Sequence, residues 1–386
     1  MRPSCRAATP EPQVSRLLKL LLIPCYLYSC IAIAQHSKPV DLRALDNNPA
    51  DAQTSRDPKE TLLYSYGEIY FDDRDDLLDK ALEVKEEGEN LEARSRGLLL
   101  IPGDEQDLVD ALEALDGATT SLRSRGAIIL ATSSESPFHY RVGSELRGTA
   151  RFYYDEGDEN RLRFAGITGL FGGPDLESYM DISAILENHA GINYHFRLDA
   201  LPNTEFGILG KVQVISLLER RIDYDDYEKN KVFDWDTDIK NRVQLNADLG
   251  IRHSIGHVGL HLLVKDLYTE SLRGASGDLY RQRSRVIAGI DYRRPWGDVQ
   301  IMGDLVPRAR FGEAPQRRDV NLSASLNVTR RFALVMGYNY AEHRYERDTG
   351  NAGIRYTLGR SLRAEISVTA AGKRELGGHA SLQLPL

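Results

Sequence analysis

The chain has 386 residues, a formal net charge of -8 and a mean hydropathy of -0.40. An acidic balance provides no broad positive field for nucleic acid, so no nucleic-acid contact is expected. The length allows two or three ordinary domains or one large all-β unit.

The N-terminus combines basic residues with an apolar stretch from Leu20 to Ile33, which is the layout of a secretory signal peptide. Small residues end this stretch and predict cleavage after Ala34, at a site made by Ala32, Ala34 and Gln35. Lipoprotein processing at Cys30 is the alternative. A single-pass anchor is disfavoured because the apolar run is shorter than the roughly 20 residues that a helical span needs.

The cysteines all fall within the predicted signal peptide, at Cys5, Cys25 and Cys30. The mature chain therefore contains none, which excludes disulfide, thiol and cysteine–metal chemistry. A cysteine-free exported chain is compatible with passage through an oxidising periplasm.

Residues 35–72 have a polar composition without periodicity and are predicted to form a flexible leader. An acidic helical segment is predicted at residues 73–117, with helices at Asp75–Ala93 and Asp104–Asp116. Each helix has an apolar face, made by Leu77, Leu78, Ala81 and Leu82 in the first and by Leu108, Val109, Leu112 and Leu115 in the second. Gly117 is expected to end the second helix. This segment is expected either in the periplasm or as a plug in a barrel lumen.

From about Gly126 to Leu386 the hydrophobic period changes to two, which is the pattern of β-strands. In the clearest run, Val320, Leu322 and Ala324 alternate with polar residues. Further runs lie at residues 142–154, 206–214, 243–251, 258–264, 286–292, 299–305, 332–340, 352–358 and 362–368. Tilted membrane-crossing strands need about 9–11 residues, and these runs have about that length. The prediction is an all-β fold with a small helical insert, namely an antiparallel transmembrane β-barrel of roughly 12–14 strands at residues 126–386.

A soluble β-sandwich or β-helix is the alternative, because soluble sheets also alternate apolar and polar positions. The barrel is favoured by charged and amide residues on the polar face, as in a wet lumen, and by aromatic residues near the ends of runs. Together with the export signal, this predicts a location in the outer membrane of a Gram-negative cell, surrounded by lipid and inserted by the barrel assembly machinery.

Several segments resemble the conjugal-transfer TraF-type outer-membrane family. They are the acidic, aromatic-rich stretch 218–227, the Val264-Lys265-Asp266-Leu267 sequence, and the stretches 285–292, 303–305 and 337–340. The resemblance covers roughly Asp72 to Leu386, and fatty-acid-channel barrels are wider relatives of that family. It implies a role in conjugative transfer and a partner in the conjugation apparatus. Family members usually begin with a glycine-rich first strand, which is not recognisable between Gln35 and Tyr70, so a shortened or divergent barrel is expected.

No residue pattern indicates catalysis or a cofactor, and the chain is expected not to be an enzyme. His253, His257 and His261 are spaced by four, but Gly256 places a turn among them, so lumen or surface histidines are expected and not metal ligands. The acidic stretch with Asp223, Asp225, Asp226, Asp234, Asp236 and Asp238 lacks the spacing of a calcium loop and is expected to be a solvated loop.

Two functions remain open. The first is a structural or channel component linked to conjugative plasmid transfer, and the second is a porin-like channel for transport of small or hydrophobic molecules. A lumen with apolar walls and a lateral gap would favour transport, whereas a closed, charged and packed lumen would favour the structural role.

Overall fold

The computed structural model of the chain describes residues 48–51, 61–95, 105–132, 136–168, 176–223, 234, 236–342, 348–358 and 362–386. The predicted cleavage-site residues Ala32, Ala34 and Gln35 lie outside these ranges, and so do Asp225 and Asp226 of the acidic stretch.

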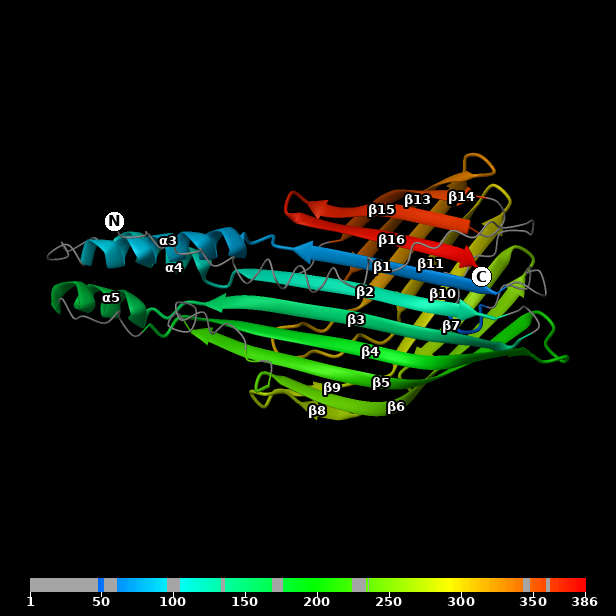
Figure 1. The fold of residues 1–386 in the computed structure, drawn as a ribbon, viewed down its shortest axis with the longest axis horizontal. Coiled ribbons are helices and arrows are strands. Elements are labelled where there is room, and N and C mark those ends of the chain that lie inside the picture. Colours follow the sequence, from blue (N-terminus) through cyan, green and yellow to red (C-terminus); the bar gives the residue numbers. More distant parts are fainter. Residues whose placement is uncertain are drawn as a thin grey trace, which may run out of the picture. The chain divides into compact units, whose positions relative to one another are not determined.

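Three helices and sixteen strands make up the described part of the chain (Figure 1). The helices are α3 (Leu77–Ser95), α4 (Gln106–Leu115) and α5 (Gly157–Thr168). The strands are β1 (Leu62–Asp72), β2 (Thr119–Ala131), β3 (Phe138–Tyr153), β4 (Tyr179–Arg197), β5 (Thr204–Asp223), β6 (Ile239–Ile255), β7 (Val258–Lys265), β8 (Ser271–Arg273), β9 (Leu279–Arg281), β10 (Arg285–Arg294), β11 (Gly297–Asp304), β12 (Asp319–Asn327), β13 (Phe332–Ala341), β14 (Thr349–Leu358), β15 (Leu362–Gly372) and β16 (Glu375–Pro385).

Fourteen of the strands form one closed antiparallel barrel. Each strand pairs with its neighbours in sequence, except that β8 and β9 form a separate two-stranded ribbon between β7 and β10. The barrel closes where β1 pairs with β16 from Leu62 to Asp72, the whole length of β1. The prediction of an antiparallel barrel of 12–14 strands is therefore confirmed, and a sandwich is excluded because a closed barrel has no second sheet to pack against.

The first strand was missed by the sequence prediction, which assigned residues 35–72 to a polar leader and began the barrel near Gly126. β1 covers Leu62–Asp72, and β2 begins at Thr119, so the helices α3 and α4 are inserted between the first two strands. The reason lies in β1 itself: Tyr64 and Tyr70 on its inner face and Ile69 and Phe71 on its outer face are all large and apolar or aromatic, which removes the period-two contrast.

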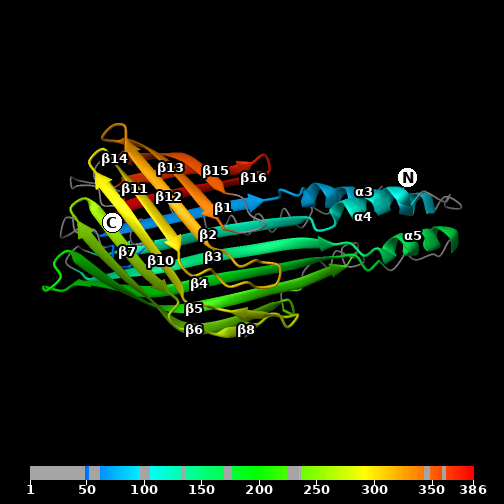
Figure 2. The same ribbon diagram turned by 180° about the vertical axis from the view of Figure 1, so that it is seen from behind.

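The strands differ in length around the barrel. Strands β2–β6, called here the long wall, have 13 to 20 residues. Strands β7, β10–β16 and β1, called here the short wall, have 8 to 11 residues. Figures 1 and 2 show the helices at one end of the barrel, beyond the ends of the first strands of the long wall.

The two predicted helices are confirmed within two residues at each end. In α4 the predicted face of Leu108, Val109, Leu112 and Leu115 is buried, and Gly117 follows the helix with a φ of 69°. In α3 the predicted face is wrong: Leu77 is buried with Val84, whereas Leu78 and Leu82 are exposed. The buried residues of α3 and α4 pack with Leu162 of α5 and Phe152 of β3 in one apolar cluster, so partners from other segments selected the buried face.

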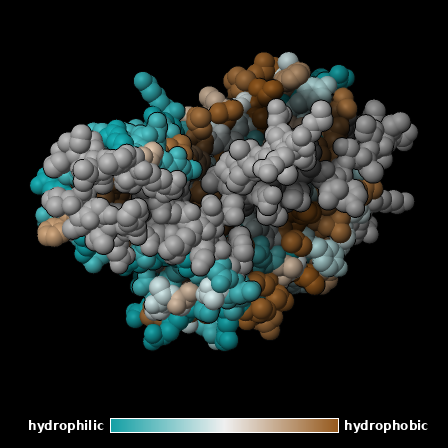
Figure 3. All heavy atoms as spheres, turned by 60° about the vertical axis from the view of Figure 1, so that its left-hand side comes forward, coloured by the Kyte–Doolittle hydropathy of each residue, from teal (hydrophilic) through white to brown (hydrophobic). Residues whose placement is uncertain are grey.

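The outer face of the barrel is apolar. Exposed large apolar side chains alternate along its strands, for example Leu245, Leu322, Leu334, Met336, Ile354, Ile366 and Val368. Figure 3 shows brown, hydrophobic residues gathered over part of the barrel and teal, hydrophilic residues over the helices. A closed barrel with an apolar outer surface satisfies its backbone hydrogen bonds internally and offers a surface that fits lipid. Among the described residues, none of the helices has the length and apolar character to cross a membrane.

Candidate functional site

The lumen is the candidate functional site, because its face is polar and charged. In β15 the inward-facing Arg363, Glu365 and Ser367 alternate with outward-facing Ile366 and Val368. Glu365 accepts a hydrogen bond of 2.7 Å from Arg355, its partner across β14, and both side chains are buried. The walls therefore hold charges in pairs that cross from one strand to the next.

Three segments enter the lumen on the side of the long wall. They are residues 48–51, which precede the barrel, the β8–β9 ribbon, and the connection 305–318 between β11 and β12. Each makes contacts with inward-facing side chains of the wall. These segments fill most of the lumen on this side, where a cavity of about 50 Å³ remains.

Residues 48–51 form a tight turn. The backbone N–H of Asp51 donates to the carbonyl of Asn48, and the N–H of Ala50 donates to the Asn48 side chain, both at 2.9 Å. The turn is held in the lumen by Asn48, which donates to the carbonyl of Ile251 at 3.1 Å, and by Asn193, which donates to the carbonyl of Pro49 at 2.9 Å. Asn48, Ala50 and Asp51 are at most 1% exposed.

Two glycines make room for this turn. Gly207 of β5 and Gly250 of β6 are partners across the two strands. A Cβ atom at Gly207 would lie 2.2 Å from the carbonyl carbon of Pro49, and one at Gly250 would lie 2.0 Å from the Asn48 side-chain oxygen. The backbone of the turn thus lies directly on the bare backbone of the wall, which only glycine allows.

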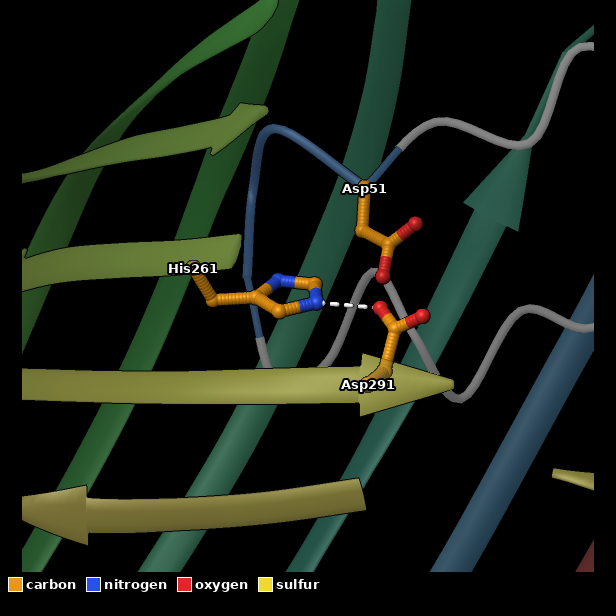
Figure 4. A group of neighbouring side chains, drawn as sticks. All are labelled: Asp51, His261 and Asp291. Carbon is orange, nitrogen blue, oxygen red and sulfur yellow. Dashed lines mark hydrogen bonds and ion pairs between the residues drawn. The ribbon is translucent and has the colours of Figure 1, made fainter. Parts of the chain in front are cut away.

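Charged groups hold the end of the turn. Arg293 binds Asp51 at 2.9 Å and Asp291 at 3.2 Å, and Arg252 lies 3.5 Å from both carboxylates. His261 bonds to Asp291 through its Nε2 atom at 2.5 Å, beside Asp51 (Figure 4), and its Nδ1 atom lies 3.4 Å from the Asn48 side chain. We call this group of Asp51, Arg252, His261, Asp291 and Arg293 the ion-pair latch.

The latch also brings together three side chains of metal-binding types, because ligand atoms of Asp51, His261 and Asp291 lie within 4.8 Å of one another. Its electrostatics favour an ion-pair network. The two carboxylates are already balanced by the guanidiniums of Arg252 and Arg293, so a divalent cation would leave an excess of positive charge in a buried site.

The ribbon and the connection 305–318 pack together against the long wall. Tyr280 of β9 and Phe311 lie edge to face at 6.0 Å between ring centroids. Both belong to a buried cluster with Ile185, Ile215 and Leu217 of β4 and β5. Polar contacts surround this cluster: Tyr280 donates to Glu187 at 3.0 Å, and the hydroxyl of Ser183 accepts from the N–H of Glu313 at 3.1 Å.

A buried ion pair lies between the two filled regions. Lys211 of β5 binds Asp248 at 2.8 Å and Asp266 at 2.7 Å, and its side chain is 5% exposed. Beside it, Gln213, Gln244 and Gln282 exchange side-chain hydrogen bonds and tie the ribbon to the wall. Every one of these groups is buried, and a cavity of about 50 Å³ lies beside Lys211, Asp248 and Gln282.

The lumen on the side of the short wall contains a cavity of about 590 Å³. Its lining includes Gly297 and Asp304, the first and last residues of β11. The cavity therefore follows the full length of that strand. Its remaining lining comes mainly from β1, β2 and the strands β10–β16.

The three histidines that are spaced by four in the sequence make separate contacts in the structure. His253 bonds to Thr204 at 2.9 Å, and His257 lies in the turn between β6 and β7, exposed, with its ring 6.5 Å from that of Tyr292. His261 alone points into the latch. The acidic stretch is structured where it is described: Asp234 and Asp236 are in a turn in which buried Asp238 accepts the N–H of Asp234 at 2.8 Å.

Sequence reasoning missed residues 48–51 because Asn, Pro and Asp in a stretch without periodicity predict a solvated leader. The available signal was the pair of strand glycines, Gly207 and Gly250, each of which interrupts a regular run. Such glycines indicate close backbone approach but do not identify which segment approaches.

Comparison with known proteins gives one family match. The family model described as "F plasmid transfer operon, TraF, protein" matches residues 47–304, a range that begins just before the turn of residues 48–51 and ends with β11. No curated protein matches the sequence significantly.

Comparison with solved structures gives matches of low identity. The Pseudomonas putida toluene transporter TodX is 9% identical over 90% of this chain and 94% of its own, with a TM-score of 0.46. The Ralstonia pickettii toluene transporter TbuX is 8% identical over 91% and 94%, with a TM-score of 0.45. A triple mutant of the Rhodopseudomonas blastica porin is 11% identical over 85% and 99%, with a TM-score of 0.31. All three TM-scores are below 0.5, so the functions of those proteins are not transferred to this chain.

Proposed function

We propose that this chain is a non-enzymatic outer-membrane component linked to conjugative transfer. The chain belongs to the family of the F plasmid transfer operon TraF protein, because that family's model matches residues 47–304. Family membership supports the link to transfer. Within that role, we assign the barrel the part of a narrowed, hydrophilic channel component.

The observation that carries this proposal is the lumen, which is polar along its walls and filled on one side only. The ion-pair latch, the ribbon and the connection 305–318 close the side of the long wall, and a cavity of about 590 Å³ remains along the short wall. A barrel of this kind has a surface for lipid outside and a water-accommodating passage inside.

The orientation follows from the connections. The turn between β6 and β7 lies between Ile255 and Val258, and it shares its end of the barrel with the start of β1 and the end of β16. The opposite end carries the long connections, including α3, α4 and α5. Because outer-membrane barrels have short periplasmic turns and longer external loops, the proposed location of the helices is the cell surface and not the periplasm. The contact that they offer to a transfer partner is then on the outside.

The alternative function is a channel for small or hydrophobic molecules. Closure of the barrel by β1 and β16 and the charged lumen argue against apolar cargo, which would need an apolar lining and a lateral exit. Small hydrophilic solutes fit the cavity and are compatible with the proposed role.

Two measurements test the proposal. The full chain, expressed in a Gram-negative cell, is expected in the outer-membrane fraction with heat-modifiable gel mobility, as for a folded barrel. Deletion of its gene from a donor is expected to lower plasmid transfer by about an order of magnitude or more, and the wild-type gene to restore it. Recovery in the inner membrane would contradict the location, and unchanged transfer would contradict the conjugative role.

A second test concerns cargo. Uptake of an apolar aromatic compound by cells with and without the protein is expected to be equal, because most of the described residues that line the cavity are charged or polar. Faster uptake in cells that contain the barrel would favour the alternative.

A further inference from the structure

One side of the cavity of about 590 Å³ is polar without being charged. It is formed by the inner faces of five neighbouring strands of the short wall, β11 to β15, which at a spacing of about 4.8 Å make a surface about 19 Å wide. We call this surface the amide patch, and its side chains in the lining of the cavity are Gln300, Asn321, Ser323, Asn339, Asn351, Ser367 and Thr369.

Strand pairing places the amides of the patch side by side. Asn321 of β12 is the direct partner of Asn339 of β13, and opposite residues on one face of a sheet have Cβ atoms about 4.5–5.5 Å apart. Asn351 of β14 lies over Gly337 of β13, since a Cβ atom at Gly337 would lie 2.6 Å from the Asn351 side-chain oxygen. The amides of three strands therefore form one continuous surface.

The side chains of the amide patch have no hydrogen-bond partners in the described part of the chain. Each amide carries two donor hydrogens and one acceptor oxygen, and each hydroxyl can both donate and accept. The Oδ1 atom of Asn339 is buried without a partner, so rotation of this amide toward a ligand breaks no bond within the described residues. On the long wall, by contrast, Gln213 and Gln244 bond to each other. The amide patch is therefore not used for packing within the described chain.

The charged groups at the border of the patch are bound to each other. Glu365 of β15 binds Arg355 of β14 at 2.7 Å, and both side chains are buried. The patch itself contains no charge that could compensate an ion for the loss of its water, which is costly, whereas a neutral polar solute loses less. The ligand that suits the patch is therefore neutral.

The ligand must also offer several hydrogen-bonding groups at once. The hydroxyl groups on successive carbons of a sugar ring each donate and accept, which matches a surface of adjacent amides and hydroxyls. One saccharide replaces several separately ordered waters, so fewer molecules are immobilised for the same number of hydrogen bonds. The cavity is large enough, because small-molecule sites have volumes of roughly 300–1,000 Å³.

We propose that the amide patch is a binding site for neutral saccharides. This inference rests on the proposed function, since it names the class of solute that the hydrophilic channel accepts. Asn321, Asn339 and Asn351 bind the hydroxyl groups of the sugar, and Ser323 and Thr369 extend the contact to either side.

The test is isothermal titration calorimetry of the purified full chain, folded in detergent, with maltotriose as the neutral saccharide. Saturable binding with a Kd of about 1 mM is expected. Polyethylene glycol of the same mass is the control solute, because its ether oxygens only accept hydrogen bonds, and it is expected not to bind. In planar lipid bilayers at about 1 M KCl, where charges are screened, maltotriose is expected to reduce the current with the same half-saturation concentration.

Variants locate the binding site. Asn321→Leu/Asn339→Leu keeps the size of the two side chains but removes their hydrogen-bonding groups, and is expected to weaken maltotriose binding about 10-fold or more. Asn241→Leu is the matched control, because Asn241 of β6 is exposed and does not line the cavity, and it is expected to bind like the wild type.

A second variant keeps the test decisive where the double leucine variant does not fold, as judged by heat-modifiable gel mobility. Ser323→Ala/Thr369→Val removes two hydroxyl groups of the patch with little change in size, and is expected to weaken binding about 3-fold or more.

The outcomes distinguish this inference from the proposed function. A conducting barrel that does not bind maltotriose, or that binds polyethylene glycol equally well, would overturn the saccharide site and leave the channel role intact. A folded barrel that binds maltotriose but does not conduct would support the site and contradict the channel role. Wild-type affinity in the folded patch variants, or weakened binding in Asn241→Leu, would show that the sugar is bound elsewhere.

Discussion

The long wall and the short wall of the same barrel differ in what lies against their inner faces. Along the long wall, strands of 13 to 20 residues carry glycines and amides that receive other parts of the chain, and the charges of Lys211 and its partners are paired and buried. Along the short wall, strands of 8 to 11 residues leave a cavity that is lined mostly by charged and polar side chains. One closed sheet can therefore be a packed core on one side and a wet surface on the other, depending on what enters it.

The largest expected effect on stability concerns the buried ion pair of Lys211 in the long wall. Lys211→Met is expected to destabilise the barrel by about 3–5 kcal/mol, because it leaves the carboxylates of Asp248 and Asp266 buried without their shared cation. Urea unfolding followed by heat-modifiable gel mobility measures this. The control is Arg242→Gln, whose exposed pair with Glu270 is worth about 1 kcal/mol or less. Equal losses in the two variants would contradict a larger cost for breaking the buried pair than for breaking the exposed one.

The next effect compares an arginine substitution on the outer face of the short wall with one on its inner face. Ile366→Arg, on the outer face of β15, is expected to cost about 2–4 kcal/mol in lipid, since a charge near the bilayer midplane is costly. Thr369→Arg, on the inner face of the same strand and in the lining of the cavity, is expected to cost less than about 1 kcal/mol. The measurement is the free energy of unfolding in lipid vesicles. The reverse order would contradict the assignment of inner and outer faces.

A smaller effect tests the docking of residues 48–51. Gly250→Val places atoms where the Asn48 side chain lies, and such overpacking costs about 1–3 kcal/mol, which lowers the ratio of docked to undocked turn by about one to two orders of magnitude. The measurement is the rate at which a maleimide labels a thiol introduced by Ala50→Cys, because Ala50 is fully buried when the turn is docked. Gly210→Val is the control, because nothing lies within 4 Å of a Cβ there, and faster labelling in that variant too would contradict docking on the glycines.

The smallest expected effect concerns the stability of α5, which lies outside both walls. Burial by itself raises the pKa of Asp158, but hydrogen bonds from Glu177, Ser178 and Arg161 outweigh it and hold the pKa below its ordinary value. A carboxyl group with a lowered folded pKa stabilises the fold at pH values above its unfolded pKa, and this contribution is lost as the pH falls through the folded value.

The order of α5, measured by amide hydrogen exchange, is therefore expected to decrease in acid while the barrel strands stay protected. Asp158→Asn is expected to remove this pH dependence, and Glu159→Gln, an exposed partner of Arg163, to retain it. Simultaneous loss of protection in α5 and in the strands would show that the helical end and the walls unfold as one unit.

Local sequence patterns predicted most of the strands and helices. The runs at Val243–Ile251 and Val320–Val328 became β6 and β12, because a strand with one face in lipid and one in a polar lumen must alternate, whatever its partners. The helices α3 and α4 were also predicted, yet the buried face of α3 was not, since Leu77 and Val84 belong to an apolar cluster whose other members come from α4, α5 and β3.

The antiparallel barrel and its acidic helical insert can be recognised from the chain alone, because period-two and helical patterns are properties of neighbouring residues. The closed sheet was needed to place residues 48–51 in the lumen, to bring His261 and Asp291 against them, and to place the amides of β12, β13 and β14 side by side along a cavity. The contacts responsible join residues 203 and 242 positions apart, as in Asn48 with Ile251 and Asp51 with Arg293. Such contacts depend on closure of the whole sheet, and a local pattern contains no information about which strand will lie opposite.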